Sequence, residues 1–200
     1  PESSTFTKTP MYLNEINLIE AISKSLPISW KLYVKEHQSM IGRRNMKFYN
    51  KIKKFHNVKI VTSNFYKDPK PWIEKSLGVV TITGTTAFQA SMLNKPAIVF
   101  GNVFYNVISG IKVANSIEDL ENLFKLVQNN NWTKDNTIDC AAYLKTVQEI
   151  GTAVNLRSLN KFSAMKIRSK LLNTDQEKDF KYMINNLMIF YENAVNICND

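Results

Sequence analysis

The sequence predicts an α/β fold in which a parallel sheet is covered by helices on both faces. Three observations lead to this prediction. Apolar runs of strand length alternate with helical patterns over about the first 128 residues, the order that is typical of βαβ units. Polar clusters directly follow two of these runs. The chain has 200 residues, of which 44% are hydrophobic, and this is enough to bury a sizeable core.

The first predicted elements follow from the spacing of apolar residues. Helical intervals predict a helix over 14–26, which Pro27 ends. Residues 30–35 alternate in the manner of a strand. A second helical pattern covers 46–55, and a strand is expected over 58–61.

The next segment continues the alternation and contains clear stop and start signals. Gly78 ends one helical pattern, Pro96 introduces a strand, and Ser116 with Asp119 forms a Ser-x-x-Asp pattern that predicts a helix start. The expected elements are, in chain order, a helix over 72–77, a strand over 79–83, a helix over 85–94, strands over 97–100 and 111–113, and a helix over 117–128.

The C-terminal part has a different character. Helical patterns run through 137–153, 156–172 and 175–197 without intervening strands. We therefore expect a Rossmann-like domain over 1–130 and a helical extension over 131–200, which packs on that domain or on a missing N-terminal domain. The chain begins at Pro1 rather than at Met, and we expect it to be part of a longer polypeptide.

Charge and cysteine content restrict the class of protein. The chain has 26 Lys and Arg against 17 Asp and Glu, a formal net charge of +9. Because the lysines are spread along the chain without a dense Arg block, we read most of them as solvated and expect no nucleic-acid partner. An anionic membrane surface is a better candidate for a peripheral contact. Cys140 and Cys198 lie far apart in no metal-binding pattern, which predicts a reducing compartment and no metal.

No apolar run in the sequence has the length of a membrane span. The N-terminus lacks the charged segment followed by an apolar segment that is typical of a signal peptide. Together with the cysteines, this predicts a cytoplasmic protein, with the inner face of the cell membrane as its expected place of peripheral association.

The turn at Gly84 is the first candidate for a binding site. Gly84 lies between a predicted strand and a predicted helix. We expect it to adopt a backbone angle that other residues avoid and to let a ligand approach the main chain. Thr85 and Thr86 would then lie at the first turn of the helix, where N–H groups face a bound anion. The alternative is that Thr85 only caps its own helix.

The polar cluster Lys35-Glu36-His37-Gln38-Ser39 is the second candidate, because it follows another apolar strand. In a parallel sheet both clusters would emerge at the same carboxyl edge. A histidine there can hold a phosphate or stabilise a leaving group. Glu36 can orient the ring, bind a sugar hydroxyl or pair with Lys35. His56 is expected to be an ordinary surface residue.

Arg43 and Arg44 follow Gly42 and are further candidates for phosphate contacts. Arginine suits this role because its guanidinium can donate two parallel hydrogen bonds to phosphate oxygens. The alternative, which we favour at this point, is that both arginines are solvated surface residues.

Several of these segments resemble one protein family. The residues that resemble it are Pro1-Glu2-Ser3-Ser4, Leu32-Tyr33-Val34-Lys35-Glu36-His37, Gly42-Arg43-Arg44, Phe48-Tyr49, Asn57-Val58, Thr81-Ile82-Thr83-Gly84-Thr85-Thr86-Ala87-Phe88-Gln89-Ala90 and Lys95-Pro96-Ala97-Ile98-Val99-Phe100-Gly101. In order and spacing they are similar to the C-terminal half of bacterial glycosyltransferases that make capsule and surface polysaccharides, the relatives of the capsule Kdo transferases. The likeness runs from residue 1 to about residue 125.

The resemblance implies a GT-B arrangement, in which two Rossmann-like domains face each other and this chain is the domain that binds the nucleotide sugar. The implied donor is a CMP-activated sugar, with no further cofactor, and the acceptor is lipid-linked or an oligosaccharide. The resemblance implies donor-binding roles for His37, Lys35, Gly84, Thr85 and Thr86. Taken with the residue patterns, we expect catalytic roles for His37 and Glu36. The positions expected to bind the nucleotide are Lys35, Ser39, Arg43, Gly84, Thr85, Thr86 and Gln89.

Two positions depart from the family pattern. Gln38 stands where the family has Pro, and Gln89 stands where it has an acid. An amide can still donate to and accept from a hydroxyl or a base edge, but it carries no charge. Since acceptor-activating groups would lie partly in an N-terminal domain, we expect this chain alone to bind a nucleotide without transferring a sugar.

Two alternatives stay open. A teichoic-acid type transferase of polyol phosphates shares the architecture and uses a CDP-activated donor. Such proteins have a turn similar to Asp-Tyr-Ser-Ser, however, at the position where this chain has Thr83-Gly84-Thr85-Thr86. A non-catalytic nucleotide-binding or scaffold module of a polysaccharide export complex is the other alternative, and the amide at Gln89 favours it.

Overall fold

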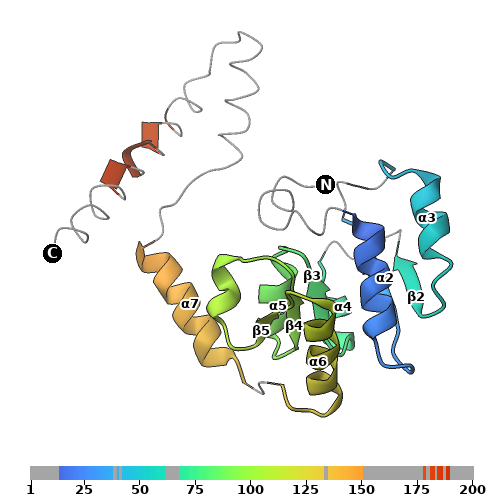
Figure 1. The fold of residues 1–200 in the computed structure, drawn as a ribbon. Helices are drawn as coiled ribbons and strands as arrows, with labels where there is room; N and C mark the ends of the chain where they lie inside the picture. The colour runs from blue at the N-terminus through green and yellow to red at the C-terminus, as the bar shows by residue number, and fades with distance from the viewer. Residues whose placement is uncertain are drawn as a thin grey trace, which may run out of the picture. The chain divides into compact units, whose positions relative to one another are not determined.

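The computed structural model describes residues 14–37, 40, 42–61, 68–132 and 135–150, together with 178, 181–182, 184–186 and 188–189. The chain divides after Ala141 into two compact units. The first unit contains the sheets, and the second begins within the last helix before residue 151 (Figure 1). Each unit is considered by itself below.

The strands of the first unit form two parallel sheets. In the first sheet β1 (Leu32–Lys35) pairs with β2 (Val58–Val61), with Leu32 opposite Val58. In the second sheet β4 (Ala97–Val99) lies between β3 (Val79–Thr81) and β5 (Ile111–Val113). Every residue of β4 is buried, as expected for a central strand with both faces covered.

One hydrophobic core joins the two sheets. Leu32 of β1 and Val80 of β3 pack against the same buried cluster, which includes Ile98 of β4. Val58 of β2 belongs instead to a smaller cluster, and Leu32 contacts both clusters. β1, and not β2, contributes to the core that β3 and β4 share. No strand pairing joins the two sheets within the described residues.

Helices cover both faces of this arrangement. On one face α2 (Glu15–Ser25) contacts α6 (Ile117–Gln128), and both contribute buried side chains to the shared core. On the other face α4 (Lys70–Lys75) contacts α5 (Thr86–Met92). Neighbouring residues of β1 point to these two faces, because Leu32 enters the core beside α2 whereas Tyr33 packs on Trp72 of α4. The α/β fold with a Rossmann-like parallel arrangement is thus confirmed (Figure 1).

Local signals explain most helix boundaries. The Asn14 side chain caps α2 by accepting from the backbone N–H groups of Ile16 and Asn17. Ser116 and Asp119 form a reciprocal capping box at α6, which begins and ends where the sequence predicts. Helix α3 (Met46–Ile52) is shorter than expected, because Lys53 ends it and the chain continues in turns.

Three elements around the Gly84 turn differ slightly from the prediction. Helix α4 begins at Lys70, before Pro71, because a proline is tolerated in the first turn of a helix. Strand β3 ends at Thr81, two residues early, and α5 ends at Met92. Asn94, just beyond α5, has a left-handed backbone with φ of 54°.

The opposite, amino edge of the second sheet is closed by residues that follow α6. The indole Nε1 of Trp132 donates to the carbonyl oxygen of Gly110 at 3.1 Å. Asn136 is fully buried, and a Cβ at Gly110 would lie 2.1 Å from its Nδ2. The Cys140 thiol lies 3.6 Å from Ser91 Oγ of α5. The core of the first unit therefore extends past residue 130.

The last long helix, α7 (Thr137–Ile150), spans the boundary between the two units. In the second unit the described residues between 178 and 189 are also helical. The helix expected over 156–172 lies outside the described residues, as does most of the one expected over 175–197. None of the described helices is long and apolar enough to cross a membrane.

Candidate functional site

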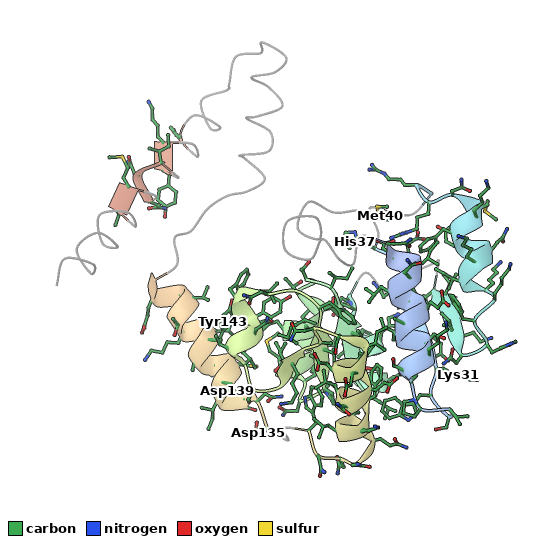
Figure 2. The ribbon with its side chains drawn as sticks, in the orientation of Figure 1. Lys31, His37, Met40, Asp135, Asp139 and Tyr143 are labelled. Carbon is green, nitrogen blue, oxygen red and sulfur yellow. The ribbon has the colours of Figure 1, made fainter. Side chains whose placement is uncertain are left out.

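The cluster after β1 alternates between the interior and the surface. Lys35 ends the strand and is half-buried, Glu36 is buried, and His37 is exposed. Figure 2 shows His37 at the opposite end of β1 from Lys31. His37 therefore lies at the carboxyl edge of the strand, as the sequence predicts. Gln38 and Ser39 lie outside the described residues.

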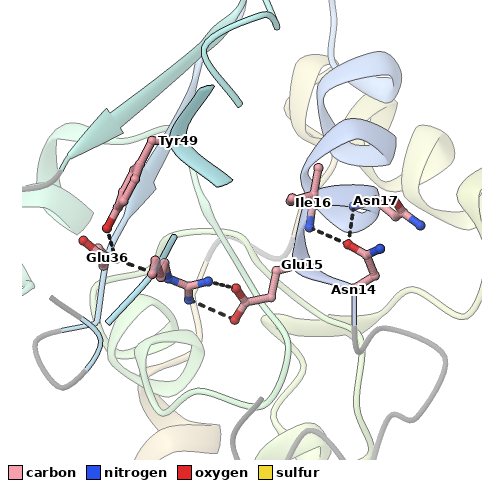
Figure 3. A network of polar contacts seen from close by, with 7 residues as sticks. Asn14, Glu15, Ile16, Asn17, Glu36 and Tyr49 are labelled. Atoms are coloured by element: carbon pink, nitrogen blue, oxygen red, sulfur yellow. Dashed lines mark hydrogen bonds and ion pairs between the residues drawn. The ribbon is translucent and has the colours of Figure 1, made fainter. Parts of the chain in front are cut away.

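The buried Glu36 carboxylate is the centre of a polar network (Figure 3). The Tyr49 hydroxyl of α3 donates to Glu36 Oε1 at 2.8 Å, and Arg44 Nε lies 3.2 Å from the same oxygen. The Arg44 guanidinium also makes a bidentate ion pair with Glu15 at the start of α2, with Nη2 3.0 Å from Oε1. The guanidinium carbon of Arg44 lies 4.4 Å from the centre of the Phe48 ring. The network thereby connects α2, the end of β1 and α3.

The electrostatics of this network favour the charged form of Arg44 and the neutral form of Tyr49. The hydrogen bond to Glu15 raises the pKa of Arg44 above its usual value, and the two carboxylates add to this effect. The hydrogen bond to Glu36 raises the pKa of Tyr49. One cation between two carboxylates is consistent with an ion network that positions a loop.

Two expectations about this segment need correction. Glu36 pairs with Arg44 and Tyr49, and the pairing with Lys35 that the sequence allowed is wrong. The interpretation of Arg44 as a solvated surface residue is also wrong. Its side chain is only 16% exposed, and two acidic side chains neutralise its charge. Arg43 is exposed and keeps the surface position. His56 is exposed, as expected.

The turn after β3 is held by uncharged groups. The buried Tyr105 hydroxyl donates to the carbonyl oxygens of Thr83 at 3.0 Å and Gly84 at 2.8 Å. The Gly84 N–H donates to Thr81 Oγ1 at 3.2 Å. Tyr105 belongs to a 3₁₀ turn, η3 (Phe104–Val107), which follows β4. The segment that follows β4 therefore holds the turn that follows β3 in place.

The reason for a glycine at position 84 differs from the one expected. Gly84 does not have the positive φ that Gly42 has, so the predicted unusual backbone angle is wrong. A Cβ at Gly84 would instead lie 2.7 Å from Thr81 Oγ1, which is too close. Glycine suits this position because the Thr81 hydroxyl, which accepts from the Gly84 N–H, occupies the space that a Cβ would need.

The start of α5 leaves its threonines available. Thr85 is exposed, and its side chain makes no capping hydrogen bond, so the interpretation of Thr85 as a simple helix cap is wrong. Thr86 and Gln89 are half-buried on the first turns of α5. With seven residues, α5 is a short helix.

The two predicted clusters follow β1 and β3, strands of different sheets that share one hydrophobic core. His37 follows β1 and Gly84 follows β3. Sequence reasoning did not identify Glu15, Tyr49 or Tyr105 as parts of this region. Only tertiary contact connects them with the loops, although a tyrosine just after a predicted strand, such as Tyr105, is a signal that could have been followed.

A sequence model of the capsule polysaccharide biosynthesis protein family matches residues 14–126. This chain belongs to that family. The match begins at the residue that caps α2 and ends within α6, so it covers both parallel sheets and both predicted clusters of the capsule biosynthesis protein. No curated protein and no solved structure matches the chain significantly.

Proposed function

We propose that this capsule biosynthesis protein is the donor-binding part of a glycosyltransferase and that it binds a CMP-activated sugar. One observation carries the proposal. The two polar loops follow the carboxyl ends of β1 and β3, parallel strands of two sheets that share one hydrophobic core. We infer that β1 lies next to β3, so that the strand order reverses between them; ligands of open α/β sheets bind at the carboxyl ends of the strands at such a point.

The residues at this edge suit an anionic, hydroxyl-rich ligand. His37 and Arg43 are exposed cationic or hydrogen-bonding groups, and Lys35, at the end of β1, is half-buried. An imidazolium or ammonium there would stabilise the negative charge that develops on a departing nucleotide phosphate. The exposed Thr85 hydroxyl and the Gln89 amide would supply neutral hydrogen bonds to the ribose or the base.

Glu36 has a different role in this proposal. Its carboxylate is buried and already accepts hydrogen bonds from Tyr49 and Arg44, so it is placed to fix the loop that carries His37. We therefore assign Glu36 and Arg44 as positioning residues. The groups that activate the acceptor would come from another domain of the complete transferase.

Calorimetric titration of the 200-residue chain with CMP tests the proposal. His37→Ala should weaken CMP binding by about tenfold or more, since a hydrogen bond to a charged group contributes about 1.5–3 kcal/mol. His56→Ala is the matched control, because it removes the other histidine of the chain from an exposed position. Equal affinities for the two variants, or no heat with any cytidine nucleotide, would contradict the proposal.

The same titration separates the alternatives. Tighter binding of CDP than of CMP would favour a transferase of polyol phosphates. Gln89→Glu restores the acid of the family pattern and should raise CMP-sugar affinity about fivefold if this position contacts a ribose hydroxyl, because charged acceptors make stronger hydrogen bonds. Gln128→Glu, at the end of α6, is the control. An unchanged affinity for Gln89→Glu would favour the non-catalytic module.

A further inference from the structure

The segment around α3 has an unusual charge distribution. Residues 37–67 contain no Asp or Glu. The same residues include eight cations: Arg43, Arg44, Lys47, Lys51, Lys53, Lys54, Lys59 and Lys67. Acidic residues occur on both sides of this segment, from Glu36 backwards and from Asp68 onwards. A cationic field here is therefore not offset by neighbours in the sequence.

Four of these cations are exposed in α3 or in the turn that follows it, and together we call them the basic surface: Lys47, Lys51, Lys53 and Lys54. Lys47 and Lys51 are four residues apart and therefore lie on the same side of α3. Lys53 and Lys54 follow in the turn after the helix. Figure 1 shows α3 at the margin of the first unit, beside β2.

The basic surface is not neutralised by the protein. None of its lysines takes part in an ion pair within the part of the chain that the structure describes. Arg44 is the cation of this segment that the nearby acids Glu15 and Glu36 neutralise. Four ammonium groups thus remain available to an external anion.

We propose that the basic surface docks the protein on an anionic lipid membrane. Lysines on a helix at a membrane surface each add to the attraction by anionic headgroups. Met46, whose residue is 65% exposed at the start of α3, offers an apolar side chain for the headgroup boundary. The proposal goes beyond nucleotide binding and does not require it.

The aromatic residues of α3 argue against single-stranded nucleic acid as the occupant. Such ligands stack their bases on exposed rings. Phe48 and Tyr49 are half-buried, and both already have partners. The Arg44 guanidinium lies over the Phe48 ring, and the Tyr49 hydroxyl donates to Glu36. The basic surface therefore offers charge without a stacking platform, which fits a layer of lipid headgroups.

The docking site also lies near the proposed donor site. Tyr49 of α3 contacts Glu36 at the carboxyl end of β1, one residue before His37. Docking through α3 would hold this part of the sheet edge close to the membrane. A lipid-linked acceptor would then be within reach of a bound donor.

Vesicle sedimentation of the whole chain tests the proposal. The probes are phosphatidylcholine vesicles with and without phosphatidylglycerol. We expect binding that requires phosphatidylglycerol and weakens as NaCl is raised. The double variant K47Q/K51Q should bind about 25-fold more weakly, from the contribution of each lysine near an anionic surface.

The matched control is K75Q/K125Q, which removes the same charge from exposed lysines on α4 and α6. Its binding should change much less. Equal losses for the two double variants would overturn the proposal in favour of an effect of net charge. Binding to heparin with none to the vesicles would also overturn it and would indicate an acidic polymer as the partner. CMP titration of K47Q/K51Q should match that of the unmodified chain, so a failure of docking is distinguishable from a failure of the donor site.

Discussion

The loop after β1 and the turn after β3 end at the same kind of strand edge but are stabilised in different ways. A buried ion network of Glu36, Arg44 and Glu15 fixes the loop after β1. Uncharged hydrogen bonds from Tyr105 and to Thr81 fix the turn after β3. The first depends on charges from separate elements, whereas the second depends on neutral hydroxyl groups that bond to its backbone.

This difference predicts which substitutions should destabilise each half of the proposed site. A buried charge that loses its partner costs far more than a neutral hydrogen bond that is removed. The loop that carries His37 should therefore respond strongly to loss of a single charged residue. The turn at Gly84 should respond moderately to changes that add or remove a few atoms.

The largest effect is expected for Arg44→Ala. This change leaves the Glu36 side chain, which is only 5% exposed, without its cation. We expect the free energy of unfolding to fall by about 3 kcal/mol. Urea denaturation measures it. The neighbouring Arg43→Ala is the matched control and should change stability by less than about 0.5 kcal/mol, because Arg43 is exposed. Equal losses would show that the network contributes no special stability.

A smaller effect is expected for Tyr105→Phe. The variant removes the hydroxyl that donates to the Thr83 and Gly84 carbonyl oxygens, and it should lower the free energy of unfolding by about 1.5 kcal/mol. Tyr33→Phe, at an exposed tyrosine, is the control. If the proposed donor site is correct, Tyr105→Phe should also weaken CMP binding in the calorimeter, whereas Tyr33→Phe should not.

A double-mutant cycle tests the close approach at Gly84. Gly84→Ala places a Cβ 2.7 Å from Thr81 Oγ1, and we expect a cost of about 1 kcal/mol. In a Thr81→Ala background, which removes this oxygen, most of the cost should disappear. Thermal unfolding of the four proteins gives the coupling energy. Additive effects would mean that the turn needs glycine for another reason.

The pH dependence of stability provides the most selective probe of the charged loop. The hydrogen bond to Glu36 raises the folded-state pKa of Tyr49 above its ordinary value of 10.0. Its contribution is therefore complete below the unfolded-state pKa and is lost as pH rises through the folded-state value. Tyr49→Phe should remove this alkaline loss, so the difference in urea midpoint between the two proteins should shrink above pH 10. A difference in urea midpoint that stays constant with pH would contradict the hydrogen bond between Tyr49 and Glu36.

The fold could be predicted from sequence wherever the signal is local. The capping box of Ser116 and Asp119 placed α6 correctly, and the apolar run before it placed β5 correctly. Boundaries shifted where a tertiary contact competes with local pattern. The run that begins at Val79 looks like a strand up to Thr83, but Tyr105 takes the Thr83 carbonyl oxygen and the turn begins earlier.

The candidate site was predictable in position but not in construction. The end of an apolar strand is visible in sequence, so the places of His37 and Gly84 could be expected. Glu15, Glu36 and Arg44 come from three separate segments, and no sequence spacing relates them. The same limit explains why Arg43 and Arg44, adjacent in sequence, have opposite environments.

The closure of the amino edge by Trp132, Asn136 and Cys140 sets a practical limit for recombinant work. The segment shared with the family ends at residue 126, and a fragment cut there would remove the indole that covers Gly110 and the amide that fills the space beside it. Such a fragment would expose apolar surface of the central strands. A stop codon placed after Ala141 would instead keep the whole first compact unit, including these three side chains.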